Sequence, residues 1–354
     1  MEKIKIKLVA IAKNEAAYLP QWIFHHLRLG VDSIDIYING SSDNSAEISR
    51  IISSFEPRFK YYESDKYVEK CIKKGRNFQK YIYNRAFRKC NKRDSFSHLL
   101  VLDLDEYLMP EKLEHDLKDF IRSSGDVSVV AFPWCFDAPC SLEAKPFQRF
   151  ICPTINLSPH SHVKSIGRIE DIKRVKIHTF VLKAGESNDI NRTKKILSTG
   201  IEINSQNSRI HGSILGSEAQ KAFKEKIFES WFVLHRVNKS EAEYLASLLK
   251  GRADRLSNKD FRNLLKDNRD GFSLFDPKTM LQKNYDSSSV HDYYLAFDAF
   301  LDRLSIRKEL EKSQYFILDQ VRELDDLICK YPKVADVFRK QFVGTRYFSS
   351  RALA

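Results

Sequence analysis

Runs of apolar residues alternate with stretches of helical spacing along the first half of the chain. The apolar runs predict strands at residues 4–12, 33–38, 59–63, 98–102 and 127–133. Apolar positions three and four residues apart predict helices at residues 19–29, 46–53 and 75–89. Strands that alternate with helices are typical of an α/β fold with a mainly parallel central sheet.

The second half has a different pattern. We expect a strand at 175–182 and a polar excursion or flexible loop at 185–216. From residue 217 onward helical periodicity dominates, with the clearest helices at 218–228, 240–256, 292–304 and 314–329. The sequence therefore predicts an α/β domain over residues 1–240 and a helical region over 241–354, which packs on its own domain or forms a dimer.

An acidic motif, Asp103-Leu104-Asp105-Glu106, directly follows the apolar run at 98–102. Side chains two apart in an extended backbone point the same way, so Asp103 and Asp105 would aim two carboxylates at one point. Mg²⁺ and Mn²⁺ are commonly held by one or two carboxylates together with phosphate oxygens of a substrate. The motif indicates a metal site for a phosphate-bearing substrate, and the alternative is an acidic turn without a metal.

Two other polar segments follow predicted strands, at 13–15 and 39–43. In open α/β sheets ligands bind beyond the carboxyl ends of the strands. We expect these two loops and the acidic motif to converge there. His25 and His26 lie on the first predicted helix, where packing against the sheet is the expected role.

Composition narrows the class of protein. The 354 residues include 59 Lys and Arg against 47 Asp and Glu, a net charge of +12 that favours phosphorylated ligands, anionic membrane surfaces or nucleic acid. No nucleic-acid-binding motif is recognisable and the basic residues are dispersed, which argues against nucleic acid. Without an apolar run of roughly 18 residues, the chain is expected to stay in the cytoplasm, with peripheral association at the inner face of a membrane as an option. The six cysteines lack the spacing of a zinc site or a disulfide framework.

Several segments, in this order and spacing, resemble the glycosyltransferase family 2-like and family 92-like enzymes, which have a GT-A fold. These segments are 10–15, 19–31, 37–43 and 102–108, with a later stretch at 234–240 and 250–252. The resemblance implies that the first region is a GT-A-like glycosyltransferase domain. It also implies that the first two loops hold the nucleotide of a sugar donor and that the DxD residues bind the metal on its diphosphate.

Carried over to this sequence, Lys13 and Glu15 would contact the base or ribose, and Asn39, Ser41 and Asp43 would line the nucleoside side. Asp103 and Asp105 would hold Mn²⁺ or Mg²⁺, with Asp103 also on the nucleotide-sugar. The family often has an Asp before the Asn of the second loop, where this chain has Ile38. Lys164 is a candidate phosphate partner, and its spacing to His178 resembles a Lys-to-His spacing that follows the DxD strand in the family.

Transfer with inversion also needs a general base for the acceptor hydroxyl, normally a carboxylate. The candidates are Asp137 and either member of the pair Glu170 and Asp171. Trp134 either packs in the core or stacks on an acceptor sugar. A histidine, His178 or His235, is a candidate third metal ligand, because neutral imidazole suits Mn²⁺.

The main hypothesis is a metal-dependent glycosyltransferase that moves a sugar from a nucleotide-diphosphate donor, expected to be a UDP-sugar, to a saccharide or glycolipid acceptor in surface-polysaccharide synthesis. Inversion is expected from the resemblance. The alternative is a nucleotide-sugar-binding or scaffold protein that has the fold without turnover.

Overall fold

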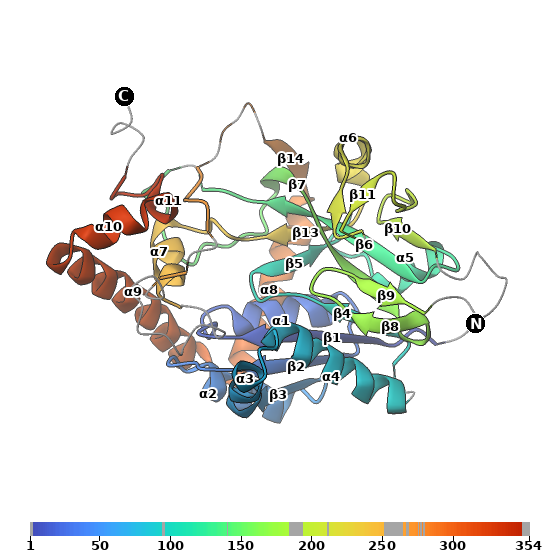
Figure 1. Ribbon diagram of the computed structural model, residues 1–354, viewed down its shortest axis with the longest axis horizontal. Coiled ribbons are helices and arrows are strands. Elements are labelled where there is room, and N and C mark those ends of the chain that lie inside the picture. Colours follow the sequence, from blue (N-terminus) through green and yellow to red (C-terminus); the bar gives the residue numbers. More distant parts are fainter. Residues whose placement is uncertain are drawn as a thin grey trace.

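The computed structural model describes residues 3–93, 96–139, 141–183, 194–210, 212–250, 265–266, 269–274, 276, 278 and 280–348. In these residues a twelve-stranded mixed sheet forms the centre, with the order β3-β2-β1-β4-β7-β6-β13-β5 along its main path. Figure 1 shows the helices of residues 307–342 at the left of the sheet.

The first half of the sheet is parallel. Its strands are β1 (Ile6–Ala12), β2 (Ser33–Ile38), β3 (Phe59–Glu63) and β4 (His98–Val101). The connecting helices are α1 (Leu19–Arg28), α2 (Ser45–Phe55), α3 (Asp65–Lys73) and α4 (Phe78–Arg93). Because β2 and β4 pair with opposite edges of β1, the order of strands reverses between β1 and β4, which is where open α/β sheets bind ligands.

Antiparallel pairing dominates the second half. Its strands on the main path are β5 (Glu106–Met109), β6 (Val129–Phe136), β7 (Thr154–Arg168) and β13 (Phe232–His235). β7 pairs antiparallel with both β4 and β6, whereas β13 runs parallel to β6 and antiparallel to β5. The shorter strands at the margins are β10 (Lys195–Leu197), β11 (Ser208–Arg209), β12 (Ile214–Leu215) and β14 (Leu281–Asn284). β8 (Ile172–Val175) and β9 (Phe180–Leu182) form a separate hairpin.

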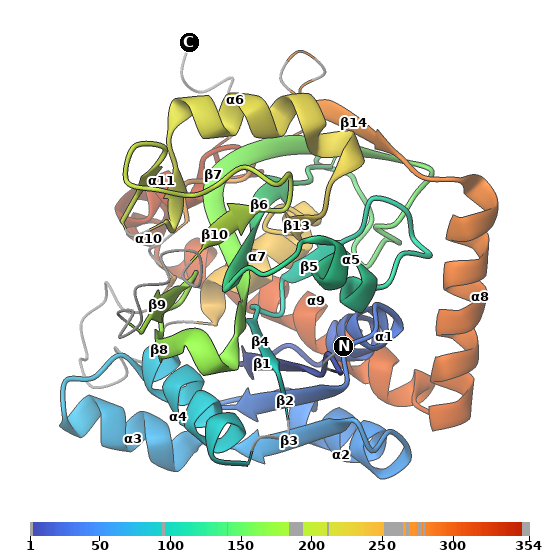
Figure 2. The same cartoon turned by 90° about the vertical axis from the view of Figure 1, so that its right-hand side faces the viewer.

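Helices surround the sheet and continue through the C-terminal region. They are α5 (Leu117–Ser123), α6 (Ser217–Lys226), α7 (Glu241–Leu249), α8 (Ser287–Leu304), α9 (Arg307–Lys330), α10 (Lys333–Val337) and α11 (Arg339–Phe342). α8 lies beside α1 and shares the main hydrophobic core through Tyr293 and Phe300 (Figure 2). α9 packs on α7 around a second core that includes Leu245 and Leu324. In the described part of the chain, no helix is both long and apolar enough to cross a membrane.

The α/β class, the mainly parallel first half and the helical C-terminal region are confirmed. The strand expected at 175–182 is instead a hairpin, because the chain turns at 176–179, where the Lys176 N–H donates to the Thr179 carbonyl (2.9 Å). The expected loop at 185–216 contains β10, β11 and β12, and residues 184–193 lie outside the described residues. The helix expected at 240–256 is described to Leu249, and 251–256 lie outside the described residues. A domain boundary at residue 240 stays a prediction.

Two buried histidines attach α1 to β5. His25 Nε2 lies 2.8 Å from the Leu108 carbonyl, and His25 Nδ1 lies 3.3 Å from the Tyr293 hydroxyl. The Leu108 N–H donates to His26 Nε2 (3.3 Å), so His26 donates through Nδ1 to the Trp22 carbonyl (2.8 Å). Both rings are neutral in this network, and their expected packing role is confirmed. Burial lowers the pKa of His25 to about 4.

The buried ring of His25 makes the fold sensitive to acid. Between pH 6.5 and about pH 4 an unfolded histidine binds a proton that folded His25 does not, so the free energy of unfolding falls as the pH falls through this window. We expect His25 to contribute roughly 3 kcal/mol to that loss. His25→Gln keeps a donor for Leu108 without titrating, so urea unfolding at pH 7 and pH 5 should show a smaller loss than in the wild type. An unchanged loss would contradict this origin.

Candidate active site

The acidic motif forms a turn between β4 and β5. The Glu106 N–H donates to the Asp103 carbonyl (3.1 Å), and the Trp22 indole of α1 donates to the carbonyls of Asp103 (3.2 Å) and Glu106 (2.7 Å). The expectation that an extended backbone aims both aspartates at one point is therefore wrong. The turn gives Asp103 and Asp105 different partners, although it does lie beyond the carboxyl end of β4, beside the loop that follows β1.

Asp103 is held by side chains from α4 and β7. Its Oδ1 accepts hydrogen bonds from Gln79 Nε2 (2.8 Å) and the Tyr83 hydroxyl (3.2 Å), and its Oδ2 lies 3.0 Å from Lys164 Nζ. Burial alone would raise the pKa of Asp103, but the neighbouring Lys164 ammonium acts against burial, and the pKa of Asp103 is lowered. The Asp103 side chain is 35% exposed. Asp103 therefore keeps its charge and part of its contact with solvent.

Lys164 itself is fully buried and joins two carboxylates. Its Nζ also lies 3.1 Å from Oε2 of Glu106, another side chain with no exposed surface. Burial would lower the pKa of Lys164, but the two carboxylates more than offset it and raise the value. Glu106 Oε2 accepts the Asp103 N–H (2.8 Å), while its other oxygen is buried without a hydrogen-bond partner. Burial raises the pKa of Glu106. Lys164 was expected to contact a phosphate, yet in the structure it neutralises the acidic turn.

Asp105 faces the other way, toward basic side chains. His235 Nε2 on β13 and Arg269 Nη2 each lie 3.4 Å from Asp105 Oδ2. Burial would raise the pKa of Asp105, but His235 and Arg269 hold it well below the usual range. His178, the other candidate ligand, lies in the β8–β9 turn with Nδ1 3.2 Å from the Val163 carbonyl. The structure thus brings His235, rather than His178, against Asp105.

Hydrogen bonds connect the loops that follow β1 and β2. Asn14, at a φ of 52°, donates its N–H to Ser41 Oγ (3.0 Å), and the Ala16 N–H donates to Asp43 Oδ2 (2.9 Å). Asn39 is buried at the end of β2. The convergence expected for these residues is present. Ser41 and Asp43 have in addition a structural role that the sequence pattern did not indicate.

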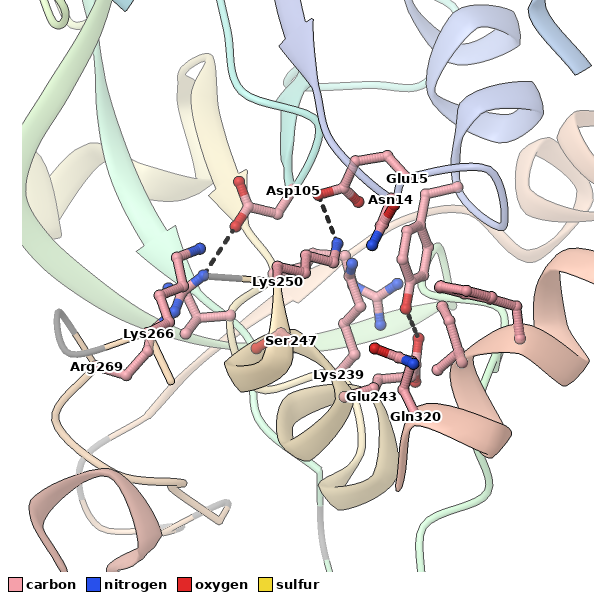
Figure 3. A pocket seen from close by; sticks show the side chains of 16 residues that line it. Asn14, Glu15, Asp105, Lys239, Glu243, Ser247, Lys250, Lys266, Arg269 and Gln320 are labelled. Carbon is pink, nitrogen blue, oxygen red and sulfur yellow. Dashed lines mark hydrogen bonds and ion pairs between the residues drawn. The ribbon is translucent and has the colours of Figure 1, made fainter. Parts of the chain in front are cut away.

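A basic pocket lies between this loop and α7 (Figure 3). Glu15 pairs there with Lys250 (2.7 Å), and Lys13 stands nearby with a pKa that burial and Lys250 lower. Burial also lowers the pKa values of Lys239 and Lys266 to about 8. Neither of these two lysines forms an ion pair with a described residue. The described side chains that carry charge along this pocket are Glu15, Asp105, Glu243, Arg236, Lys239, Lys250, Lys266 and Arg269.

The pocket encloses only about 40 Å³, which suits a few water molecules. It can receive small anionic groups such as phosphates, whereas a whole nucleotide needs several hundred Å³. Sequence reasoning found Lys13 and Glu15 but missed Lys266 and Arg269. Their segment shows no periodic pattern, and its only local signal is the basic charge.

The structure places the three candidate general bases in two different regions. Asp137 follows β6, whose end pairs with β13 at His235, and its Oδ2 accepts from Arg236 Nε (2.7 Å). Glu170 and Asp171 lie in a short 3₁₀ helix, where the Ile169 N–H donates to the Ser97 carbonyl (2.8 Å). β7 runs antiparallel to β4, so its carboxyl end meets the amino end of β4. Glu170 and Asp171 therefore lie at the opposite end of β4 from Asp103, and only Asp137 reaches the site.

Trp134 stands at the centre of an aromatic wall beside the acidic turn. Ring centroids of His162 and His235 lie 5.2 Å and 4.4 Å from its own. Phe136 and His160 extend the wall, with centroids 4.9 Å apart. The indole nitrogen of Trp134 is buried without a hydrogen-bond partner. Trp134 packs among these rings, and both uses considered for it stay open.

Comparisons with known proteins find no match to a family model and none among curated proteins. Among solved structures, 4-diphosphocytidyl-2C-methyl-D-erythritol synthase aligns with a TM-score of 0.31 and 10% identity, over 65% of this chain and 100% of its own. HddC from Yersinia pseudotuberculosis aligns with a TM-score of 0.28 and 14% identity, over 56% of this chain and 95% of its own. An active-site mutant of LgtC aligns with a TM-score of 0.24 and 13% identity, over 46% of this chain and 57% of its own. Scores this low carry no conclusion about fold or function.

Proposed function

We propose that this protein is a glycosyltransferase that uses a nucleotide-diphosphate sugar, with a UDP-sugar as the expected donor. The observation that carries the proposal is the position of the acidic turn. It lies at the point where the strand order reverses, with Asp105 facing a pocket that holds the ammonium groups of Lys239 and Lys266, neither of which forms an ion pair with a described residue. A departing diphosphate gains negative charge, which a cation held by carboxylates and nearby ammonium groups can both stabilise.

The donor set of the turn suits Mg²⁺ or Mn²⁺. In the described part of the chain, no three His, Cys, Asp or Glu side chains already form a metal site. These ions do not require one, because one or two carboxylates and the substrate's phosphates commonly suffice. Asp105, 23% exposed, and Asp103 offer hard oxygen atoms, and His235 adds an imidazole beside Asp105. A bound divalent ion would supply positive charge to the departing diphosphate.

The remaining roles follow from the chain's own groups. Lys239, Lys250 and Lys266 bring positive charge to the phosphates. Asp137 is the proposed general base. Its ion pair with Arg236 holds Oδ2, while Oδ1 is buried without a hydrogen-bond partner among the described residues. A carboxylate held in this way can accept the proton of an acceptor hydroxyl that approaches along the Trp134 wall.

The acceptor is proposed to be a saccharide or glycolipid in surface-polysaccharide synthesis, with inversion at the transferred sugar. Cytoplasmic location and peripheral membrane association belong to the same proposal. Titration calorimetry of UDP with and without Mn²⁺ tests the donor site, and release or transfer of sugar from UDP-sugars tests turnover. Metal-dependent binding without turnover would favour the alternative, a nucleotide-sugar-binding or scaffold protein.

Lys239→Met is the sharpest test of the basic pocket. Its buried ammonium lies 3.3 Å above the Tyr18 ring and lowers stability, because burial reduces its pKa from 10.5 to about 8. We expect Lys239→Met to raise the free energy of unfolding by roughly 1 to 3 kcal/mol. We also expect UDP affinity to fall about tenfold, since a charge-assisted contact is lost.

Uridine, which lacks phosphates, is the matched ligand control and should bind wild type and Lys239→Met equally. Stability is measured by urea unfolding at pH 7 and affinity by calorimetry. A variant that loses stability and keeps its UDP affinity would show that Lys239 has a structural role and would remove it from the proposed donor site.

A further inference from the structure

A second, larger cavity lies outside the basic pocket just described. It encloses about 810 Å³ between α4 and the β8–β9 turn, with residues 210 and 213–214 along a third side. Both overall views show the β8–β9 hairpin beside α4 (Figures 1 and 2). Among the described residues that line it, the charged ones are all basic: Arg76, Lys80, Arg88, Arg174 and Lys176. We call this cavity the α4–β8 groove.

The five basic side chains of the α4–β8 groove have no acidic partner among the described residues. None of them forms an ion pair with a described residue, although ion pairs are frequent elsewhere on the surface. Burial lowers the pKa of Lys176, and the nearby charges of Arg174 and Lys80 lower it further. Like charges gathered around one cavity repel each other, and an anion between them removes that repulsion. The groove therefore has the electrostatics of an anion site.

The walls of the groove are fixed before any ligand binds. The Asn84 side chain of α4 makes two hydrogen bonds to the backbone of Val175, donating to its carbonyl (2.8 Å) and accepting from its N–H (3.0 Å). This pair attaches the hairpin to the helix. Ile210, 65% exposed, adds an apolar surface at the edge of the groove. Because the hairpin is already attached to the helix, less freedom is lost when a ligand binds between them.

A series of packed rings connects one side of the α4–β8 groove with the acidic turn. His162 and His178 line the groove. The ring of His162 lies 5.2 Å from that of Trp134, which in turn lies 4.4 Å from His235. His235 contacts Asp105 at 3.4 Å. The groove is therefore separated from Asp105 by the rings of His162, Trp134 and His235, close enough for one extended acceptor to reach both along the aromatic wall.

We propose that the α4–β8 groove binds a phosphate group of the acceptor, so that the acceptor is a phosphate-bearing saccharide or a lipid-linked saccharide phosphate. This inference rests on the proposed transferase function for the meaning of "acceptor". The donor diphosphate already has its own cations in the basic pocket, on the other side of Asp105. A nucleic acid fits the groove less well, because the cations surround one cavity and do not form a stripe along the surface.

The experiment measures phosphate binding with the donor site saturated by UDP and Mn²⁺. One arm titrates glucose 6-phosphate against glucose. The other measures sedimentation with phosphatidylcholine vesicles containing a polyprenyl phosphate, against vesicles of phosphatidylcholine alone. We expect at least one phosphate-bearing probe to bind wild type. We also expect Lys80→Ala with Arg174→Ala to weaken that binding at least tenfold while UDP affinity is unchanged.

Lys74→Ala with Lys173→Ala is the matched control, since it removes the same charge from exposed positions next to the groove. An equal loss in this control would reduce the effect to general surface charge and overturn the inference. If UDP binds but neither phosphate probe does, the inference about the α4–β8 groove is overturned and the proposed function is not. If a phosphate probe binds but UDP does not, the proposed function is overturned and the groove is an anion site of another kind. Tight binding of a single-stranded RNA oligomer that is lost in the groove variant would also overturn it.

Discussion

Lys164→Met is expected to destabilise the protein by about 3 to 5 kcal/mol, the largest effect on folding that we predict. The substitution keeps the length of the side chain and removes the only charge in contact with both Asp103 and Glu106 in the described structure. Glu106 has no exposed surface, so its carboxylate would be left buried without a compensating charge.

Urea unfolding at several pH values measures this effect. Without Lys164 the pKa of Glu106 should rise further, so the folded variant binds a proton at a pH where the unfolded chain does not. The stability of the variant relative to wild type then increases as the pH is lowered toward 7 and changes little below pH 7, because Glu106 of the folded wild type, with a pKa of about 7, also binds a proton there. Lys164→Met with Glu106→Gln should recover much of the loss at pH 7. Lys173→Met, at an exposed position, should change stability by less than about 0.5 kcal/mol. A stable Lys164→Met variant would show that the acidic turn does not need this ammonium.

Asp105→Asn is expected to produce the largest effect on activity, a fall in the rate of transfer of about 10² to 10³-fold. Of the two aspartates, Asp105 is the one that faces the basic pocket, and it lies 3.4 Å from both His235 and Arg269. Asparagine keeps the size of the side chain and removes the negative charge. The variant loses the negative charge that would hold a cation on the diphosphate, while the turn keeps its bonds to Trp22.

Sugar transfer from a UDP-sugar measures the effect, with the metal dependence of UDP binding as the second readout. Asp105→Asn should abolish the Mn²⁺-dependent part of the binding. Asp43→Asn is a useful comparison, because Asp43 accepts a hydrogen bond from the loop after β1. This substitution should change the stability of the protein more than the metal dependence of UDP binding. Undiminished transfer by Asp105→Asn would exclude Asp105 as a metal ligand.

The first half of the fold could be predicted because β1, β2 and β4 are almost entirely buried and largely apolar, whereas the edge strand β3 is only partly buried but rich in aromatic residues. The expected strands at 33–38 and 59–63 match β2 and β3 in both bounds. The acidic motif and the loops after β1 and β2 were found for the same reason, since each follows one of these apolar strands. β7 was missed because its sequence contains Pro159 and several polar residues, so it has no comparable apolar run.

The rest of the site depends on strand direction and on distant contacts. Lys164 and Glu170 are six residues apart, which is roughly 20 Å of extended chain, and the pairing of β7 with β4 decides which of them meets Asp103. Arg269 meets Asp105 across 164 residues of sequence. No local pattern contains either fact, so the sequence could indicate the chemistry of the site but not its charge balance.

The basic pocket takes its charges from both sides of residue 240. Glu15 and Asp105 come from loops of the sheet, and Lys250, Lys266 and Arg269 come from the C-terminal region. A fragment that ended at residue 240 would keep Arg236 and Lys239 but lose these three cations, so we expect it to bind the proposed diphosphate more weakly than the whole chain. The helical region therefore supplies much of the positive charge of the pocket, and a chimaera of the two regions from separate proteins would bind the diphosphate only where these cations are kept.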